Sequence, residues 1–188
     1  MSSRSSFVRT FGALLTGAAL TLTLVGCGGA SGGAGAESGN SDGSLVGQPA
    51  PDFTAETVSG DGPKTVKEAN GKVTIIDFWA TYCGPCKKSF PKYQELVDQF
   101  GGDLAVLAVS VDEKDTDKAK LEEFVKATDV KFSVVWDKEQ NAAKAYKPPK
   151  MPTAFIVDKA GVVRHIHAGY GEGEEEKIAD EIKALLEK

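Results

Sequence analysis

Residues 78–88 read FWATYCGPCKK and contain two cysteines, Cys83 and Cys86, separated by Gly-Pro. The preceding run, residues 73–80, is mostly apolar and lies between turn signals, which is typical of a strand buried on both faces of a sheet. Residues 84–100 have the pattern of a helix that the following two glycines should end. A strand that leads a Cys-x-x-Cys pair into a helix N-terminus favours redox chemistry.

The expected helix gives the two thiols different surroundings. A disulfide needs Cα atoms about 4.4–6.8 Å apart, and the first helical turn brings positions i and i+3 near that range. Cys83 should lie at the N-cap or first position, where free N–H groups and the helix dipole favour a thiolate. Cys86 should be more buried and less acidic. We therefore expect Cys83 to form a mixed disulfide with a partner and Cys86 to resolve it.

The pair also allows two other interpretations. A structural disulfide suits an oxidising compartment, but a bridge across so few residues closes a tiny loop and gives little chain-entropy stabilisation. A zinc site would need a second Cys or His pair at suitable spacing, and the sequence has none. Redox activity is the favoured interpretation.

The rest of residues 45–188 predicts alternating strands and helices. We expect strands over residues 53–58, 104–111, 132–136, 153–157 and 162–168, and helices over 118–128, 141–146 and a C-terminal segment striped by Ile178, Ile182, Leu185 and Leu186. This order predicts parallel crossovers followed by an antiparallel hairpin at one edge, in an α/β sandwich.

The N-terminal region has the pattern of an export signal. Arg4 and Arg9 precede an uncharged run, residues 11–25, that is too short for a comfortable membrane span but suits a secretory signal. Residues 24–27, LVGC, resemble the lipobox of bacterial lipoproteins. We therefore expect a signal peptide over residues 1–26 and a lipidated Cys27 that begins a Gly/Ser-rich tether over 27–44. The domain follows over residues 45–188.

Composition limits the remaining function classes. The 188-residue chain is 41% hydrophobic and has a formal net charge of -5, so it has no basic footprint for nucleic acid. His165 and His167 alternate on one expected strand but lack a third metal ligand, and we expect them to be exposed. Residues 169–173 are Gly-rich but follow a hairpin, so a flexible lead into the last helix is favoured over a phosphate loop. No cofactor and no metal are expected.

Several segments together resemble the thioredoxin superfamily. Residues 77–87 resemble the thioredoxin active-site strand and helix, and residues 151–153 resemble its cis-proline loop. Residues 47–53 and 112–136 resemble the TlpA/ResA-like, redoxin (AhpC/TSA-type) branch of membrane-anchored, extracytoplasmic thiol-disulfide oxidoreductases. The resemblance implies a thioredoxin-like three-layer α/β/α sandwich with a central mixed sheet and an extra N-terminal strand segment.

The resemblance also implies roles for individual residues. Asp77 would be a buried acid that accepts the proton of Cys86, with a pKa raised by its apolar surroundings; without the resemblance, a strand-end Asp that reaches water is an equal alternative. Pro152 would be cis and leave the Met151 backbone free for an extended substrate segment. The residues implied in substrate contact are Trp79, Tyr82, Gly84, Pro85, Met151 and Pro152. The alternatives are core packing for Trp79 and a solvated loop for Tyr82.

The chain also departs from its relatives. ResA-like proteins often carry Glu where this chain has Ser89, and Asn where it has Asp77. The strand expected over residues 104–111 has no lysine to pair with Asp77, as thioredoxin has. Asp77 is therefore expected to be less well compensated than in thioredoxin.

Three functions were compared. The favoured one is a monomeric, lipid-anchored reductase outside the cytoplasm, on the periplasmic side in a Gram-negative cell. It would act on disulfides of exported proteins, with cytochrome c maturation as one setting, and would be re-reduced by a membrane thiol donor. The alternative is a copper chaperone using Cys83, Cys86 and a histidine. A thiol peroxidase, suggested by residues 50–53, lacks the peroxidatic pattern at Cys83 and ranks last.

Overall fold

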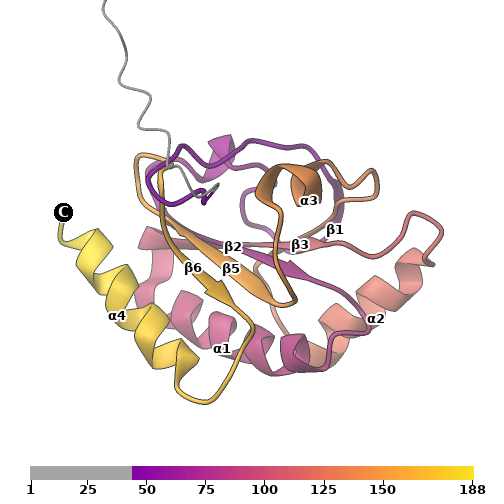
Figure 1. The fold of residues 1–188 in the computed structure, drawn as a ribbon. Coiled ribbons are helices and arrows are strands. Elements are labelled where there is room, and N and C mark those ends of the chain that lie inside the picture. The colour runs from indigo at the N-terminus through magenta and orange to yellow at the C-terminus, as the bar shows by residue number, and fades with distance from the viewer. Residues whose placement is uncertain (1–43) are drawn as a thin grey trace, which may run out of the picture. The chain divides into compact units, whose positions relative to one another are not determined.

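The computed structural model describes residues 44–188, and the predicted signal peptide, Cys27 and nearly all of the tether lie outside them. Six strands form one mixed sheet in the order β1-β4-β3-β2-β5-β6 (Figure 1). The strands are β1 (Glu56–Ser59), β2 (Val73–Trp79), β3 (Leu104–Ser110), β4 (Ser133–Trp136), β5 (Thr153–Val157) and β6 (Val163–Ala168). The helices are α1 (Gly84–Phe100), α2 (Lys118–Thr128), α3 (Asn141–Tyr146) and α4 (Glu174–Leu186). Short 3-10 turns cover Lys67–Ala69 and Gly101–Asp103.

The sheet has the predicted combination of parallel and antiparallel pairs. Strands β2, β3 and β4 run parallel. Strands β5 and β6 form an antiparallel hairpin, and β5 pairs antiparallel with β2. The extra N-terminal strand, β1, closes the other edge against β4. The predicted α/β sandwich is therefore confirmed.

Alternation along the central strands builds one core on each face of the sheet. Val73, Ile75 and Trp79 of β2 join the core beneath α1, α2 and α4, whereas Ile76 and Phe78 join the core beneath α3. Figure 1 shows α1, α2 and α4 along one face and α3 on the other. Because both faces are covered, every residue of β2 and β3 is buried. None of the helices within residues 44–188 combines the length and apolar character that a membrane span requires.

The first strand begins three residues later than predicted. Phe53 is buried and packs edge-on against Tyr146, with ring centroids 6.0 Å apart, but it lies outside β1. The first ladder pair is Glu56 with Trp136, the last residue of β4. Strand β4 ends at Trp136, and the carboxylate of the next residue, Asp137, accepts hydrogen bonds from the start of α3, so residues 53–55 lie beyond the paired part of β4. The apolar pattern therefore predicted the burial of Phe53 correctly, but it wrongly predicted that Phe53 belongs to a strand.

The expected exposure of His167 is wrong. Its ring is only 4% exposed and lies between β6 and α4, with Nδ1 2.5 Å from a Glu174 oxygen and Nε2 2.6 Å from a Glu181 oxygen. His165 is half-exposed, with Nδ1 3.4 Å from the other Glu181 oxygen. Strand β6 is at the edge of the sheet by hydrogen bonding, yet α4 covers one of its faces. The local sequence does not reveal that cover.

Candidate active site

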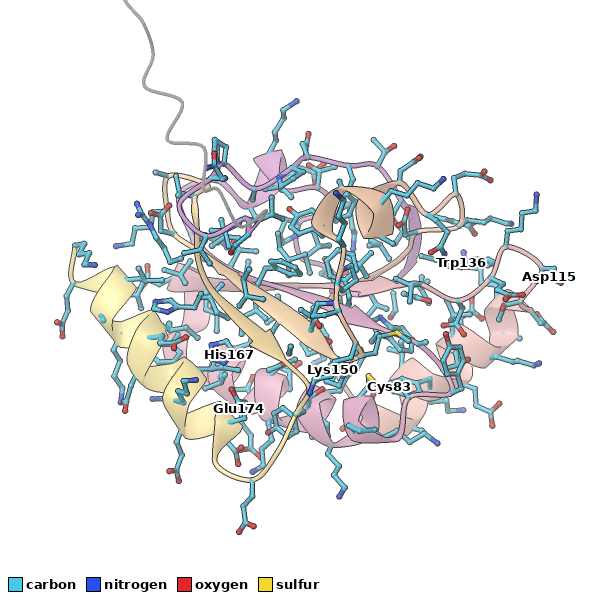
Figure 2. The ribbon with its side chains drawn as sticks, in the orientation of Figure 1. Cys83, Asp115, Trp136, Lys150, His167 and Glu174 are labelled. Carbon is cyan, nitrogen blue, oxygen red and sulfur yellow. A yellow bond between two sulfur atoms is a disulfide. The ribbon has the colours of Figure 1, made fainter. Side chains whose placement is uncertain are left out.

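Cys83 and Cys86 form a disulfide at the N-terminus of α1 (Figure 2). Their Cα atoms are 5.3 Å apart, within the expected range. Cys83 is the N-cap residue, and its sulfur accepts a hydrogen bond of 3.2 Å from the Cys86 backbone N–H. Cys83 retains slight exposure, whereas Cys86 is fully buried. The predicted difference in burial is confirmed, and Cys83 lies at the positive end of the helix.

Asp112 holds the loop that precedes the disulfide. One of its carboxylate oxygens accepts bonds from the Thr81 backbone N–H at 2.9 Å and from the Ser110 hydroxyl at 2.7 Å, and the other accepts from the Thr81 hydroxyl at 2.6 Å. Its backbone carbonyl accepts from the Trp136 indole at 2.9 Å. Asp112 is buried, although it begins a segment rich in charged residues. Its position directly after the carboxyl end of a buried strand is the only signal that pointed to this role.

Asp77 lies in β2 on the face covered by α1 and is completely buried. Its ladder neighbours are Ala108 of β3 and Ala154 of β5. The Tyr93 hydroxyl donates to Oδ1 at 3.4 Å, and Oδ2 has no hydrogen-bond partner within residues 44–188. Burial raises the pKa of Asp77 well above its ordinary value, and the Tyr93 hydrogen bond acts in the opposite direction. The carboxyl therefore favours its neutral form, as expected for a weakly compensated acid.

The Met151–Pro152 peptide bond is cis, as the resemblance implied. The antiparallel register pairs Phe78 with Thr153, so the start of β5 lies at the same end of the sheet as the end of β2, which leads to the cysteines. The Pro152 carbonyl accepts a bond of 2.7 Å from the Gly169 N–H, which joins this loop to the residues after β6. Met151 is only partly buried. The loop thus presents backbone beside the disulfide end of the domain.

The two aromatic residues before the cysteines have opposite environments. Tyr82 is 73% exposed, whereas Trp79 is fully buried between Phe90 and Phe124, with centroids 5.0 and 4.5 Å away. The expected surface role of Trp79 is therefore wrong, because α1 and α2 cover the ring completely. Tyr82 borders a hollow of about 390 Å³ that is also lined by Thr81, Lys87, Lys120, Glu123, Phe124 and Ala127. This hollow flanks the active-site loop on the α2 side.

The histidine needed by the copper-chaperone hypothesis is engaged elsewhere. Both ring nitrogens of His167 contact carboxylates, and Figure 2 shows His167 well apart from Cys83. Across residues 44–188 no three His, Cys, Asp or Glu side chains are grouped so as to hold a metal ion. The geometry around the disulfide instead suits exchange between thiols and disulfides.

Comparison with known proteins agrees with this geometry. Residues 46–166 match the sequence profile of the AhpC/TSA family. The chain belongs to this family. One similar protein is the thioredoxin-like protein YneN of Bacillus subtilis (strain 168), which is 34% identical over 123 residues. The aligned region covers 65% of this chain and 71% of YneN.

Two further similar proteins have names that describe an activity. The thiol-disulfide oxidoreductase ResA of Bacillus thuringiensis subsp. konkukian (strain 97-27) is 33% identical over 140 residues, covering 74% of this chain and 78% of ResA. The crystal structure of a thiol:disulfide interchange protein DsbE from Chlorobium tepidum has a TM-score of 0.66 and 29% identity, over 75% of this chain and 97% of that one. The thioredoxin-like fold is confirmed, and this AhpC/TSA chain is a thiol-disulfide oxidoreductase.

Proposed function

We propose that the chain works as a reductase, passing electrons from its Cys83–Cys86 dithiol to disulfides of exported proteins. The observation that carries the proposal is the disulfide itself, with Cys83 as the N-cap of α1 and Asp77 buried in the strand that leads to it. The Gly-Pro dipeptide between the cysteines resembles the reducing thioredoxin type, which favours this direction.

The geometry supports a two-step exchange. The Cys83 thiolate attacks a partner disulfide, forming a Cys83–partner bond and releasing one partner sulfur as a thiolate. Cys86 then loses its proton to the Asp77 carboxylate and attacks Cys83, which forms the Cys83–Cys86 bond and releases the second partner thiolate. Two thiols of the chain are oxidised and one partner disulfide is reduced. A dithiol donor outside this chain restores the starting state.

Substrate contact is proposed for the exposed parts of the site. Tyr82, Gly84 and Pro85 precede or separate the cysteines, and the Met151–Pro152 backbone lies at the same end of the sheet. An extended substrate segment would pair with the free Met151 backbone groups and place its sulfur at Cys83. A Cys-x-x-Cys-His segment, the haem-attachment sequence of c-type cytochromes, is a specific candidate substrate.

The proposed location is the outer side of a membrane. Its support is the sequence of residues 1–44, where an export signal, Cys27 and a Gly/Ser-rich tether follow one another. We propose that lipid on Cys27 anchors the domain as a monomer near a membrane thiol donor. Detergent phase partitioning tests this location: the native chain should enter the detergent phase and Cys27→Ser should not, whereas equal partitioning would contradict the anchor.

Insulin-disulfide reduction by the purified full chain tests the activity. Cys83→Ser should abolish turnover, and Cys86→Ser should accumulate a mixed disulfide through Cys83. The direction follows from the reduction potential, for which a value near about -270 mV fits a thioredoxin-like reductant and one near about -120 mV fits an oxidant. An oxidant-like potential would contradict the reductase proposal. An oxidised Cys-x-x-Cys-His peptide reduced no faster than insulin would remove the cytochrome setting alone.

A further inference from the structure

Helix α1 carries a side chain that contacts the proposed proton acceptor. Tyr93 is buried, and its hydroxyl is the only side-chain group within residues 44–188 that hydrogen bonds to Asp77. Ser89, one helical turn earlier, is also buried and donates a hydrogen bond of 3.2 Å to the Cys86 backbone carbonyl. Ser89, Tyr93 and Asp77 therefore place polar side chains inside an otherwise apolar layer.

We propose that Tyr93 is a positioning residue for the thiol-disulfide exchange: its hydroxyl holds the Asp77 carboxylate and sets the pH at which that carboxylate can take the proton of Cys86. The inference rests on the role proposed above for Asp77. The neighbouring strand β3 contains no lysine, and the ladder neighbour of Asp77 in it is Ala108. The compensation comes instead from a neutral donor on the helix that also carries both cysteines.

The other groups near Asp77 on the neighbouring strands and on α4 either do not ionise or are bonded to other partners. The neighbouring strands offer Ala108 and Ala154, which do not ionise. On α4, which packs on the same face, Glu175 is bonded to Tyr170, and Glu174 and Glu181 are held by His167. The Tyr170 ring meets Tyr93 edge-on, with centroids 6.2 Å apart, and so fixes the ring without contacting Asp77.

The sign of the effect follows from the donor. A hydrogen bond to a carboxylate stabilises its ionised form, so removing the hydroxyl should raise the pKa of Asp77 further. One such bond has an effect of about one pH unit. Below the Asp77 pKa the resolving step of Tyr93→Phe should be up to about tenfold slower than that of the native chain, and above it the two rates should converge.

The experiment measures the pH dependence of the resolving step in the full chain. A Cys83 mixed disulfide is formed with a chromogenic thiol, and release of that thiol by Cys86 is followed in stopped flow between pH 5 and 9 by absorbance. Tyr93→Phe should shift the midpoint of the pH profile to higher pH by about one pH unit. Tyr170→Phe, which removes a hydroxyl in contact with Glu175 but not with Asp77, is the matched control and should leave the profile in place.

Two further variants keep the inference open to refutation. Incorporation of 3-fluorotyrosine at position 93, which makes the phenol a stronger donor, should shift the profile downward and does not depend on folding of Tyr93→Phe. In the Asp77→Asn background, Tyr93→Phe should have no further effect. A Tyr93→Phe profile that superimposes on the native one, or a rate lowered equally at every pH, would overturn the inference. An Asp77→Asn profile identical to the native one would instead overturn the proposed role of Asp77.

Discussion

Cys83 and Cys86 are one helical turn apart, yet the fold gives them separate tasks. Cys83 caps α1 and keeps part of its surface exposed, while Cys86 is sealed behind it. In the proposed exchange a partner meets Cys83 first, because Cys83 is the less buried of the two. Asp77 and Tyr93 lie on the face of the sheet that α1 covers, where the proposed exchange would transfer the proton of Cys86.

Tyr82 provides a test of substrate contact at the level of one residue. Because its side chain is highly exposed, Tyr82→Ala should change the free energy of unfolding by less than about 0.5 kcal/mol. We expect it to raise KM for insulin several-fold while leaving the reaction with a small-molecule disulfide unchanged. Steady-state kinetics with both substrates check this. An unchanged KM for insulin would exclude Tyr82 from the contact surface.

The strands on either side of β2 help to position the site. The carboxyl end of β3 supplies Asp112, which ties down the loop between β2 and α1. The β5–β6 hairpin supplies the cis-proline loop and its bond to Gly169. The active-site loop is therefore held by elements that are remote in the sequence, and its shape depends on the sheet being complete.

The Asp112 anchor should contribute to both stability and activity. Asp112→Ala leaves the buried Ser110 hydroxyl and the Thr81 N–H without their acceptor, which should cost about 1–3 kcal/mol of unfolding free energy. It should also slow insulin reduction, because the loop before Cys83 loses its support. Urea unfolding and the insulin assay provide the two measurements. Asp115→Ala, an exposed change in the following loop, is the matched control and should leave both values unaltered.

His167 should hold α4 against β6. His167→Ala leaves Glu174 and Glu181 facing each other without the ring between them. We expect it to lower the free energy of unfolding by about 1–3 kcal/mol. His165→Ala removes a longer, half-exposed contact and should cost less than about 0.5 kcal/mol. Chemical unfolding measures both, and hydrogen exchange should show faster opening of α4 in His167→Ala alone. Equal losses of unfolding free energy in the two variants would contradict the expected role of His167 in holding α4 against β6.

At the scale of the whole molecule, the domain keeps an acid, Asp77, in its interior, where the proposed function gives it the role of proton acceptor. Trp79, Phe90 and Phe124 fill one core and Phe78, Tyr146 and Phe155 the other, with ring centroids 4.5–5.7 Å apart within each group. Asp77, one of whose oxygens has no hydrogen-bond partner in the part of the chain that the structure describes, interrupts this packing. Folding must therefore desolvate a carboxyl group, and the cost depends on its charge.

The sign of the resulting pH dependence is defined by the raised pKa of Asp77. The native state holds the proton more tightly than the unfolded chain, so the contribution of Asp77 to stability is complete below its unfolded pKa of about 4. It is lost as pH rises towards the native pKa. Asp77→Asn should therefore stabilise the domain more at pH 8 than at pH 4 relative to the native chain. Urea unfolding at the two pH values checks this, and a gain that is larger at pH 4 would contradict it.

The redox pair and the order of elements were predictable from the sequence, because apolar periodicity and the Cys-Gly-Pro-Cys spacing are local properties. The cis-proline loop was implied only by the resemblance of residues 151–153 to the thioredoxin superfamily. Residues 84–100, 118–128 and 141–146 form the predicted helices within the same bounds. Tyr93, Asp112 and His167 acquired their roles only in the tertiary structure. Each contacts partners on another element, 7 to 31 residues away in the chain, and helix periodicity or loop composition does not specify which of those elements will meet. Local pattern thus determined where the thiols are, whereas packing across the sheet decided which groups hold the loop, the last helix and the proton acceptor.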